Sequence, residues 1–283
     1  MRVLFNESLK SRASFRTGGN ADVLVLPETE DELVSALEKY GSSYVFGNLS
    51  NTLITDSGIR GNVIITTAVR GMTEKDGVVT CLCGDTLSSF AVFCRSHSLK
   101  GSEFCYGIPG TIGGGVFMNC GAYGGQLSDI LTEVRAWSDK KGVFTLKNEE
   151  IGFSYRKSIF QTEPYIVLSA SFALQNGNKA EIEEKMESLM ASRRAKQPLE
   201  YPSCGSTFKR PEGHFAGALI EQCGLKGTKI GGAEVSEKHA GFVINSSCAT
   251  SDDILSLIAY IKKTVYEKTG VCLEEEIRVV GER

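Results

Sequence analysis

The chain has 283 residues, of which 41% are hydrophobic and 23% are charged, so it is long enough for a buried core and compatible with two domains. Its 31 basic and 34 acidic residues give a formal net charge of −3, which argues against a positive surface for nucleic acid or an anionic membrane. The N-terminal residues lack the apolar core of a signal peptide, and no stretch approaches the ~20 apolar residues that a membrane span needs. We therefore expect a cytoplasmic protein that captures anionic ligands with backbone N–H groups and a few cations.

Residues 1 to about 176 are expected to form an α+β region with many strands. Residues 27–41 predict a helix, with Thr29 and Glu32 matching a capping box and Gly41 ending it. The other expected elements are strands at 44–46, 63–67 and 78–83, a helix at 87–96, hairpin strands at 134–138 and 143–146, and a strand at 165–174.

Residues from 177 onward predict a smaller α+β domain. A helix at 179–195 carries Ile182, Met186 and Leu189 on one stripe. The later expected elements are a helix near 215–223, a strand at 242–245, a helix at 252–269 capped by Ser251 and stopped by Gly270, and a strand at 273–280. The expected domains are therefore 1–176, built as two lobes of about 1–70 and 71–176, and 177–283.

Nine cysteines and only three histidines bear on metal and disulfide chemistry. The cysteine count is odd, the spacings are irregular and no Cys-x-x-Cys occurs, so a zinc or iron–sulfur site has little support. We expect no metal site, and most cysteines to be small buried side chains in a reducing compartment.

The segment Gly47-Asn-Leu-Ser-Asn-Thr52 directly follows a predicted strand. Small and polar residues in a tight loop can point several N–H groups at one anion, and Ser50, Asn51 and Thr52 add side-chain donors. The loop is thus a candidate anion site, although a plain polar turn is an equally simple interpretation.

Residues 107–125 are unusually rich in glycine and cannot form a regular helix or strand throughout. Glycine is used where the backbone lies flat against a ligand, and a flavin ring needs such a surface. The segment matches neither the dinucleotide-binding G-x-G-x-x-G after a strand nor the phosphate-binding G-x-x-x-x-G-K-[ST]. A glycine-rich structural crossover is the alternative interpretation.

Three further patterns could carry chemistry. Arg156, in Ser-Tyr-Arg-Lys-Ser, could clamp a carboxylate or be an ordinary surface residue. Cations at 193–210 cluster around the Gly-Ser turn that holds Ser206. This cluster could bind a diphosphate, or it could be a solvated basic helix end. The G-x-S-x-G motif of a hydrolase is missing, so Ser206 is not expected to be a hydrolase nucleophile. In the strand at 273–280, alternation puts Glu276 and Arg278 on one face, as an acid and a cation over a pocket or an incidental ion pair.

Taken in chain order, these motifs resemble the UDP-N-acetylenolpyruvoylglucosamine reductases, the MurB family. The resemblance covers nearly the whole chain in one consistent order, which is more specific than any single motif. It runs through Arg16-Thr-Gly-Gly-Asn-Ala-Asp22, the 47–52 loop, Gly-Ile-Pro-Gly-Thr-Ile-Gly-Gly, Asn-Cys-Gly-Ala-Tyr-Gly, Ser-Tyr-Arg-Lys-Ser, Gly-Ser-Thr-Phe-Lys, the segment 225–240 and Leu-Glu-Glu-Glu-Ile-Arg.

The resemblance implies an α+β fold: a two-part FAD-binding region of the PCMH/vanillyl-alcohol-oxidase type over 1–176, and a smaller C-terminal substrate domain. It implies reduction of UDP-N-acetylglucosamine enolpyruvate to UDP-N-acetylmuramate in peptidoglycan precursor synthesis, with bound FAD and with NADPH as hydride donor. The partner is then a small nucleotide sugar, with no nucleic acid, membrane or protein partner. The short spacing of Arg156 and Lys196 resembles the subclass without an extra substrate-capping loop.

The resemblance also implies roles for individual residues. It assigns catalysis to Arg156, to Ser206 as proton donor, and to Glu276, with Lys209 assisting Ser206. Contacts with the nucleotide sugar fall on Lys196, Lys209, Arg210 and His239. Contacts with FAD fall on Gly47, Asn48, Leu49, Ser50, Asn51, Thr52, Ile108, Pro109, Gly110, Gly113, Gly114, Asn119, Gly121, Ala122, Tyr123, Gly124 and Arg278.

Two positions depart from the family pattern. Leu49 stands at the usual second glycine of Gly-x-Gly-Ser-Asn, and a positive φ there would cost a leucine roughly 1–2 kcal/mol. Gly241 stands where asparagine usually follows His-Ala. Two other functions stay open: a flavin oxidase or dehydrogenase of a hydroxy acid or sugar with the same fold, and a non-catalytic flavin or nucleotide-sugar binding protein.

Overall fold

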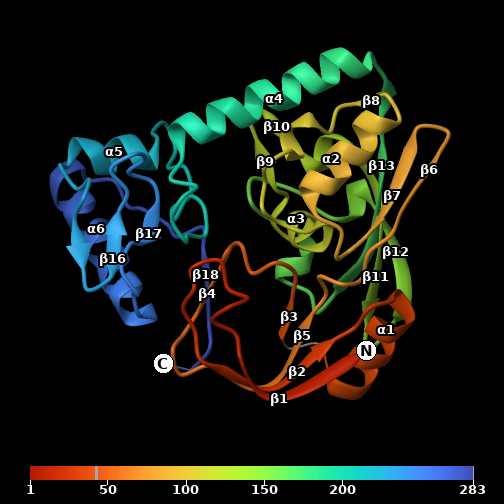
Figure 1. Ribbon diagram of the computed structural model, residues 1–283, viewed down its shortest axis with the longest axis horizontal. Helices are drawn as coiled ribbons and strands as arrows, with labels where there is room; N and C mark the ends of the chain where they lie inside the picture. The colour runs from red at the N-terminus through yellow and green to blue at the C-terminus, as the bar shows by residue number, and fades with distance from the viewer. Residues whose placement is uncertain (42–43, 283) are drawn as a thin grey trace. The chain divides into compact units, whose positions relative to one another are not determined.

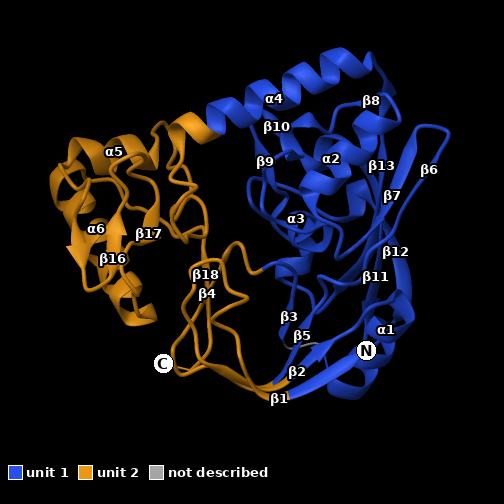
Figure 2. Cartoon of the chain, viewed as in Figure 1, with its two compact units in different colours: residues 1–4, 24–48, 62–193 blue, residues 5–23, 49–61, 194–283 orange. Residues whose placement is uncertain are grey.

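The computed structural model describes residues 1–41 and 44–282 (Figure 1). Contacts group the chain into two compact units, each assembled from separate stretches (Figure 2). Unit 1 comprises 1–4, 24–48 and 62–193, and unit 2 comprises 5–23, 49–61 and 194–283. The domain division predicted at 176/177 is a different partition of the chain and stays a prediction. Within the described residues, no helix is both long and apolar enough to cross a membrane.

Unit 1 is built on a five-stranded antiparallel sheet in the order β12-β11-β13-β7-β6. The tight turn between β11 and β12 pairs Ser138 with Gly142, whose φ of 63° suits glycine, so the predicted hairpin is confirmed. The strands are β6 (Met72–Lys75), β7 (Val78–Leu82), β11 (Leu131–Ser138), β12 (Gly142–Lys147) and β13 (Ile166–Ala173). Helix α2 (Leu87–Ser96), predicted with the same bounds, packs Phe90 on Phe172 of β13 with 4.6 Å between ring centroids.

The remaining helices that begin in unit 1 are α1 (Glu30–Tyr40), α3 (Ile112–Met118) and α4 (Lys179–Lys196). In α1 the Thr29 hydroxyl accepts the Glu32 N–H, as predicted, and the Glu32 carboxylate accepts the N–H of Glu28 at 2.9 Å. Gly41 ends this helix with a φ of 80°. In α4, Ile182 and Met186 of the predicted stripe are buried and Leu189 is half-buried.

A second sheet has four strands in the order β1-β2-β5-β3. The strand at 44–46 was predicted with its observed bounds, whereas β1 and β2 were not predicted. The bounds are β1 (Arg2–Ser8), β2 (Asn20–Leu26), β3 (Tyr44–Phe46) and β5 (Ile59–Ile65). Short pairs elsewhere are β8 (Leu99–Lys100) with β14 (Gln175–Asn176), and β9 (Gly121–Ala122) with β10 (Gly125–Gln126).

Unit 2 holds α5 (Ala216–Gln222), α6 (Ser251–Thr269) and a three-stranded antiparallel sheet of β15 (Lys229–Ile230), β16 (Ala233–Val235) and β17 (Val243–Asn245). The long helix α6 packs against this sheet (Figure 1). Its buried face supplies Ile254, Leu257, Ile258, Ile261 and Val265 to the core of the unit. This regular apolar spacing is why α6 was predictable from the sequence.

The predicted cap of α6 was wrong by one residue. Thr250, not Ser251, is the N-cap: its hydroxyl accepts the Asp253 N–H at 3.0 Å, and Asp253 accepts the Thr250 N–H in return. Ser251 is the first helical residue, and its hydroxyl donates to Asp56 at 2.9 Å. Gly270, with a φ of 72°, ends the helix as predicted.

The predicted C-terminal strand at 273–280 was too long. Only β18 (Arg278–Val280) is a strand, paired in parallel with β4 (Thr52–Ile54), whereas Glu275 makes an isolated antiparallel bridge to Phe208. The segment changes partner and direction of pairing within a few residues, so it cannot be one regular strand. The predicted alternation holds, since Leu273 and Ile277 are buried and Arg278 is exposed.

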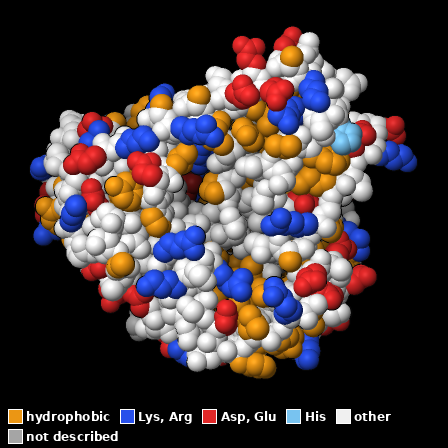
Figure 3. Space-filling model, viewed as in Figure 1, with side chains coloured by type: hydrophobic (Ala, Val, Ile, Leu, Met, Phe, Trp, Pro, Cys, Tyr) orange, Lys and Arg blue, Asp and Glu red, His pale blue; other side chains and the backbone are white. Residues whose placement is uncertain are grey.

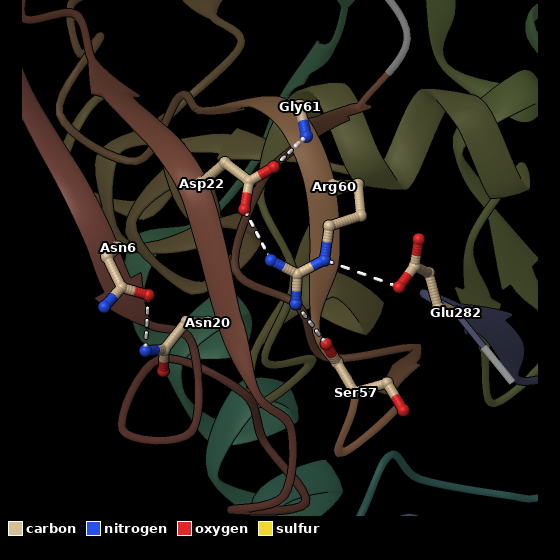
Figure 4. A network of polar contacts seen from close by, with 7 residues as sticks. All are labelled: Asn6, Asn20, Asp22, Ser57, Arg60, Gly61 and Glu282. Atoms are coloured by element: carbon tan, nitrogen blue, oxygen red, sulfur yellow. Dashed lines mark hydrogen bonds and ion pairs between the residues drawn. The ribbon is translucent and has the colours of Figure 1, made fainter.

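Asp22, at the end of the Arg16–Asp22 motif, anchors a polar network in unit 2 (Figure 4). Its carboxylate accepts from Arg60 at 2.6 Å and from the Gly61 N–H at 2.9 Å, and Arg60 also reaches Ser57 and Glu282. The motif's glycines fit closely as well, because a Cβ at Gly19 would lie 2.3 Å from the Asp56 carbonyl oxygen. Asp22 and Gly19 of this motif therefore brace the 55–61 turn.

The burial of the cysteines and the mixture of surface charges are those expected from the composition. Six of the nine thiols are buried and none is paired, so most are core side chains as predicted; burial raises the pKa of Cys83 to about 12. Acidic and basic side chains are interspersed on the face drawn in Figure 3. The described part of the chain places no group of three or more His, Cys, Asp or Glu residues where they could hold a metal ion.

Candidate active site

The loop before β4 contains one residue in the left-handed region, as anion-binding nests do. Leu49 has a φ of +50°, and the N–H groups of Ser50 and Asn51, which follow it, donate to no protein acceptor among the described residues. A left-handed residue beside right-handed ones turns successive N–H groups toward one point, where an anion can accept from them. The donor set therefore fits a diphosphate such as that of FAD.

This loop is joined in unit 2 to the segment that carries the predicted acid and cation. The Asn51 side-chain amide donates to the Glu276 carbonyl oxygen at 3.0 Å, and the Arg278 N–H donates to the Asn51 carbonyl oxygen at 3.0 Å. In β18, Arg278 pairs with Thr52 of β4. The structure thus brings together residues far apart in the sequence. Asn51 was predicted to contact the cofactor, but its side-chain amide already uses one N–H in the hydrogen bond to Glu276.

The Gly-Ser turn lies beside the same segment. Gly205 has a φ of 75°, Ser206 is exposed, and Thr207 is fully buried. The Thr207 carbonyl oxygen accepts the Glu276 N–H at 2.8 Å, so Ser206 and Glu276 are held on adjacent backbone segments. Two residues on, the Lys209 N–H donates to the Glu274 carbonyl oxygen at 2.8 Å.

The predicted substrate cations have individual environments in unit 2. The Lys209 ammonium forms an ion pair with Glu274. An interaction of Lys209 with Ser206, as expected, would therefore compete with this ion pair. The Arg210 guanidinium lies over the ring of Phe215, 4.5 Å from its centroid. Lys196 is exposed at the last residue of α4, and His239 is half-buried.

Thr207 is a functional candidate that sequence reasoning missed. Its N–H donates to the Gly241 carbonyl oxygen at 2.8 Å, and its hydroxyl accepts the Val243 N–H at 3.0 Å. With the bond from Glu276, all three polar groups of this buried residue are engaged. Its partners lie far along the chain, so no local sequence signal could have found it.

In unit 1, the glycine-rich segment folds around the short helix α3. The first N–H groups of α3 donate to the protein: Ile112 to Asp85 O at 2.8 Å, Gly113 to Cys83 O at 2.9 Å, and Gly114 to the Thr111 hydroxyl at 3.3 Å. The start of α3 is therefore not open to an anion. Gly113 packs on Cys83, with a Cβ there only 3.1 Å from the Cys83 Cβ, so packing alone explains this glycine.

Two residues of the 47–52 loop belong to unit 1 and contact this segment. The Asn48 side-chain amide donates to the Pro109 carbonyl oxygen at 2.7 Å. A Cβ at Gly47 would lie 2.1 Å from the Thr111 hydroxyl oxygen, so only glycine fits. Ile108 and Gly110 flank Pro109, and Gly110 accepts the Leu87 N–H through its carbonyl at 3.0 Å.

Asn119 and Arg156 secure the far end of the glycine-rich segment. Buried Asn119 donates to Gln126 and to the Ser154 carbonyl and accepts from the Ser128 N–H, so its amide serves the fold. Arg156 has a φ of +57° in a tight turn, and its guanidinium donates to the Gly121 carbonyl oxygen at 3.1 Å. The remaining predicted cofactor residues, Ala122, Tyr123 and Gly124, form the tip, where Tyr123 is exposed.

Substitutions of Leu49 test whether the backbone of this loop is strained. Replacing it with glycine relieves roughly 1–2 kcal/mol of backbone strain, but removes a buried leucine side chain worth roughly 2–5 kcal/mol. We expect Leu49→Gly to lower the free energy of unfolding, and FAD affinity in a titration to tighten or stay unchanged. The Leu49→Ala control loses the packing and keeps the strain. Denaturant unfolding should therefore give Leu49→Ala a lower free energy of unfolding than Leu49→Gly, the reverse of the usual order for these two residues. The usual order, or weaker FAD binding by Leu49→Gly, would show that the backbone at this position is not strained.

Comparison with known proteins places this geometry in a family. The family model for a FAD binding domain matches residues 21–146, and the model for the C-terminal domain of UDP-N-acetylenolpyruvoylglucosamine reductase matches residues 197–280. A UDP-N-acetylenolpyruvoylglucosamine reductase of Caldanaerobacter subterraneus is 46% identical over 100% of this chain and 95% of its own length. That of Clostridioides difficile is 48% identical over 99% of this chain and 94% of its own.

A solved structure agrees. The crystal structure of UDP-N-acetylenolpyruvylglucosamine reductase (MurB) from Thermus caldophilus superposes with a TM-score of 0.82 at 31% identity, covering 99% of this chain and 98% of that one. The predicted α+β fold class, with a FAD-binding region and a C-terminal domain, is confirmed. The chain belongs to the UDP-N-acetylenolpyruvoylglucosamine reductase family.

Proposed function

We propose that this chain reduces UDP-N-acetylglucosamine enolpyruvate to UDP-N-acetylmuramate in the cytoplasm, with bound FAD and with NADPH as the hydride donor. The observation that carries the proposal lies within unit 2. There the 49–52 loop, the Ser206 turn and the Glu276–Arg278 segment are hydrogen-bonded to one another. An anion nest, a hydroxyl donor and an acid–cation pair are what a diphosphate-bearing cofactor and an enol ether require.

The cofactor fits the residues present. FAD, when bound, supplies the hydride-transfer chemistry that side chains lack. The N–H groups of Ser50 and Asn51 would hold its diphosphate, and the family resemblance assigns further contacts with FAD to the 107–124 segment and to Arg278. The matched family models support a FAD-binding region within 1–176 and a substrate domain within 177–283.

Three side chains would then take part in the chemistry, and four more would bind the substrate. Arg156 would clamp its carboxylate, since a guanidinium can make two parallel bonds to it. As hydride reaches the terminal carbon, negative charge builds on that carboxylate. Arg156, and Glu276 when protonated or acting through a water, would stabilise that charge as fixed donors. The Ser206 hydroxyl would deliver a proton to the neighbouring carbon. Lys196, Lys209, Arg210 and His239 would bind the diphosphate and sugar.

Steady-state assays with the purified protein test this function against its alternatives. We expect NADPH oxidation to require the enolpyruvyl nucleotide sugar, and mass spectrometry to find a product heavier by one hydride and one proton. The same nucleotide sugar without the enolpyruvyl group should give no NADPH oxidation. Oxygen consumption with hydroxy acids or sugars would instead indicate a flavin oxidase, and ligand binding without any turnover a binding protein.

A further inference from the structure

His239 stands at one end of a hydrogen-bonded chain in unit 2. Its imidazole Nδ1 lies 3.1 Å from the backbone nitrogen of Gly241. A backbone N–H can only donate, so Nδ1 is the acceptor and the ring is the neutral tautomer with its proton on Nε2. The ring also makes an edge-on contact with Phe242, with 4.9 Å between ring centroids. His239 is therefore fixed in both position and tautomer.

The next links lead from Gly241 to the proposed catalytic residues. The Gly241 carbonyl oxygen accepts the Thr207 N–H at 2.8 Å, and the Thr207 carbonyl oxygen accepts the Glu276 N–H at 2.8 Å. Thr207 is fully buried, and Ser206 directly precedes it. A shift of Gly241 would therefore move Thr207, and with it the spacing between Ser206 and Glu276.

Two glycines make room for the His239 ring. A Cβ at Gly241 would lie 3.0 Å from His239 Cε1 and 3.1 Å from Nδ1, and a Cβ at Gly217 would lie 3.2 Å from Cε1. Each distance is tighter than ordinary van der Waals contact, so a side chain at either position would push the ring aside.

We propose that His239 is a positioning residue: its neutral imidazole holds the Gly241 amide and so sets the placement of the Ser206 hydroxyl relative to Glu276. The proposal rests on the proposed function and adds to it. The contact with the nucleotide sugar proposed above would use the Nε2–H, whereas positioning uses the opposite nitrogen. The two roles can therefore be separated by substitution.

Protonation should switch the contact off, because an imidazolium carries a proton on Nδ1 and cannot accept from Gly241. Burial lowers the pKa of His239 from its ordinary value of 6.5, and nearby Lys226 acts in the same direction. A hydrogen bond of the ring to its own backbone, and Glu221, which is bonded to Lys226, partly oppose this lowering of the pKa. The unfolded chain then takes up the proton first. The stability that this contact provides is full above about pH 6.5, declines as the pH falls through that value, and levels off below the folded pKa.

Two substitutions separate the nitrogens. Asparagine places a carbonyl oxygen near the Nδ1 position, and glutamine places its amide near Nε2. We expect His239→Asn to lower kcat much less than His239→Gln does, to raise the KM for the nucleotide sugar because the Nε2–H is lost, and to lose the decline of kcat on the acidic side. His239→Gln should lower kcat by about 10²-fold, the scale of a misplaced reacting group, with little change in the KM for the nucleotide sugar. Equal loss of kcat in both variants, or a kcat of His239→Gln close to wild type, would overturn the positioning role.

Exposed His214 supplies the matched control, since His214→Asn and His214→Gln should leave kcat, KM and the pH profile unchanged. A second measurement needs no turnover and so distinguishes failure of this proposal from failure of the proposed function. Nitrogen-15 NMR of the three imidazoles, assigned with asparagine variants, should show His239 as the Nε2–H tautomer with a pKa below 6.5. An Nδ1–H tautomer, or a higher pKa, would overturn the proposal whether or not the wild type turns over.

Discussion

Replacing Ser206 with alanine should lower turnover by roughly 10²–10⁴-fold, the usual contribution of a positioned acid. The fold should tolerate the change, because Ser206 is exposed and its φ is not in the positive region that penalises side chains. The loss should lie in the step that reduces the enol ether, since reduction of FAD by NADPH needs no proton on carbon. Stopped-flow absorbance at the flavin band can time the two steps separately.

Ser203, in the same turn, provides a control for Ser206. Ser203→Ala should leave both steps near the wild-type rate, and Ser206→Ala should bind the enol ether almost as well as wild type, because a transition-state role lowers turnover rather than affinity. Equal slowing of both steps, or loss of FAD, would indicate that Ser206 is a structural turn residue. Full activity would place the proton source elsewhere, with Cys204 or a bound water as the next candidates.

Replacing Glu276 with glutamine should retain FAD and most affinity for the nucleotide sugar but slow reoxidation of the flavin by the enol ether. Its main-chain N–H and carbonyl are held by Thr207 and Asn51, so the substitution leaves the backbone in place and removes only the carboxyl group. Loss of one fixed group that stabilises developing charge costs about 10²–10³-fold in kcat. Rapid mixing of reduced enzyme with the enol ether measures this step directly.

Glu275 is the matched control for Glu276. Its carboxylate pairs with Lys262 of α6 at 2.7 Å and lies outside the proposed site. We expect Glu275→Gln to keep normal reoxidation and to cost at most about 1 kcal/mol of stability, because both side chains of the pair remain partly exposed to solvent. Normal reoxidation in Glu276→Gln as well would remove Glu276 from the mechanism.

Local signals predicted the hairpin and every α-helix of the described residues except α3, which lies in the glycine-rich segment where no helix was predicted. Helix α2 has its predicted bounds, α1 ends at Gly41, and α6 ends at Gly270, because caps and apolar spacing are written into neighbouring residues. Strands that depend on partners far away in the sequence were harder to predict. β1 and β2 were not predicted, and the last strand was drawn too long because its exchange of partners near Ile277 leaves no trace in the alternation.

The candidate site was predictable only in part, for the same reason. Glycines and polar residues in the 47–52 loop indicate an anion site, and the strain expected at Leu49 matches its observed φ of +50°. Sequence could not tell that Gly113 serves packing or that the Asn119 amide is committed to the protein. Nor could it join Thr207 to Gly241 and Glu276, because those bonds exist only once the chain has folded.

An anaerobic titration of the purified FAD-bound protein tests the central claim most directly. We predict that NADPH bleaches the flavin absorbance in proportion to bound FAD, and that the absorbance returns only when the enolpyruvyl nucleotide sugar is added, with one product molecule formed per flavin. A flavin that NADPH does not bleach, or one whose absorbance fails to return with the enolpyruvyl sugar, would contradict the proposed reductase.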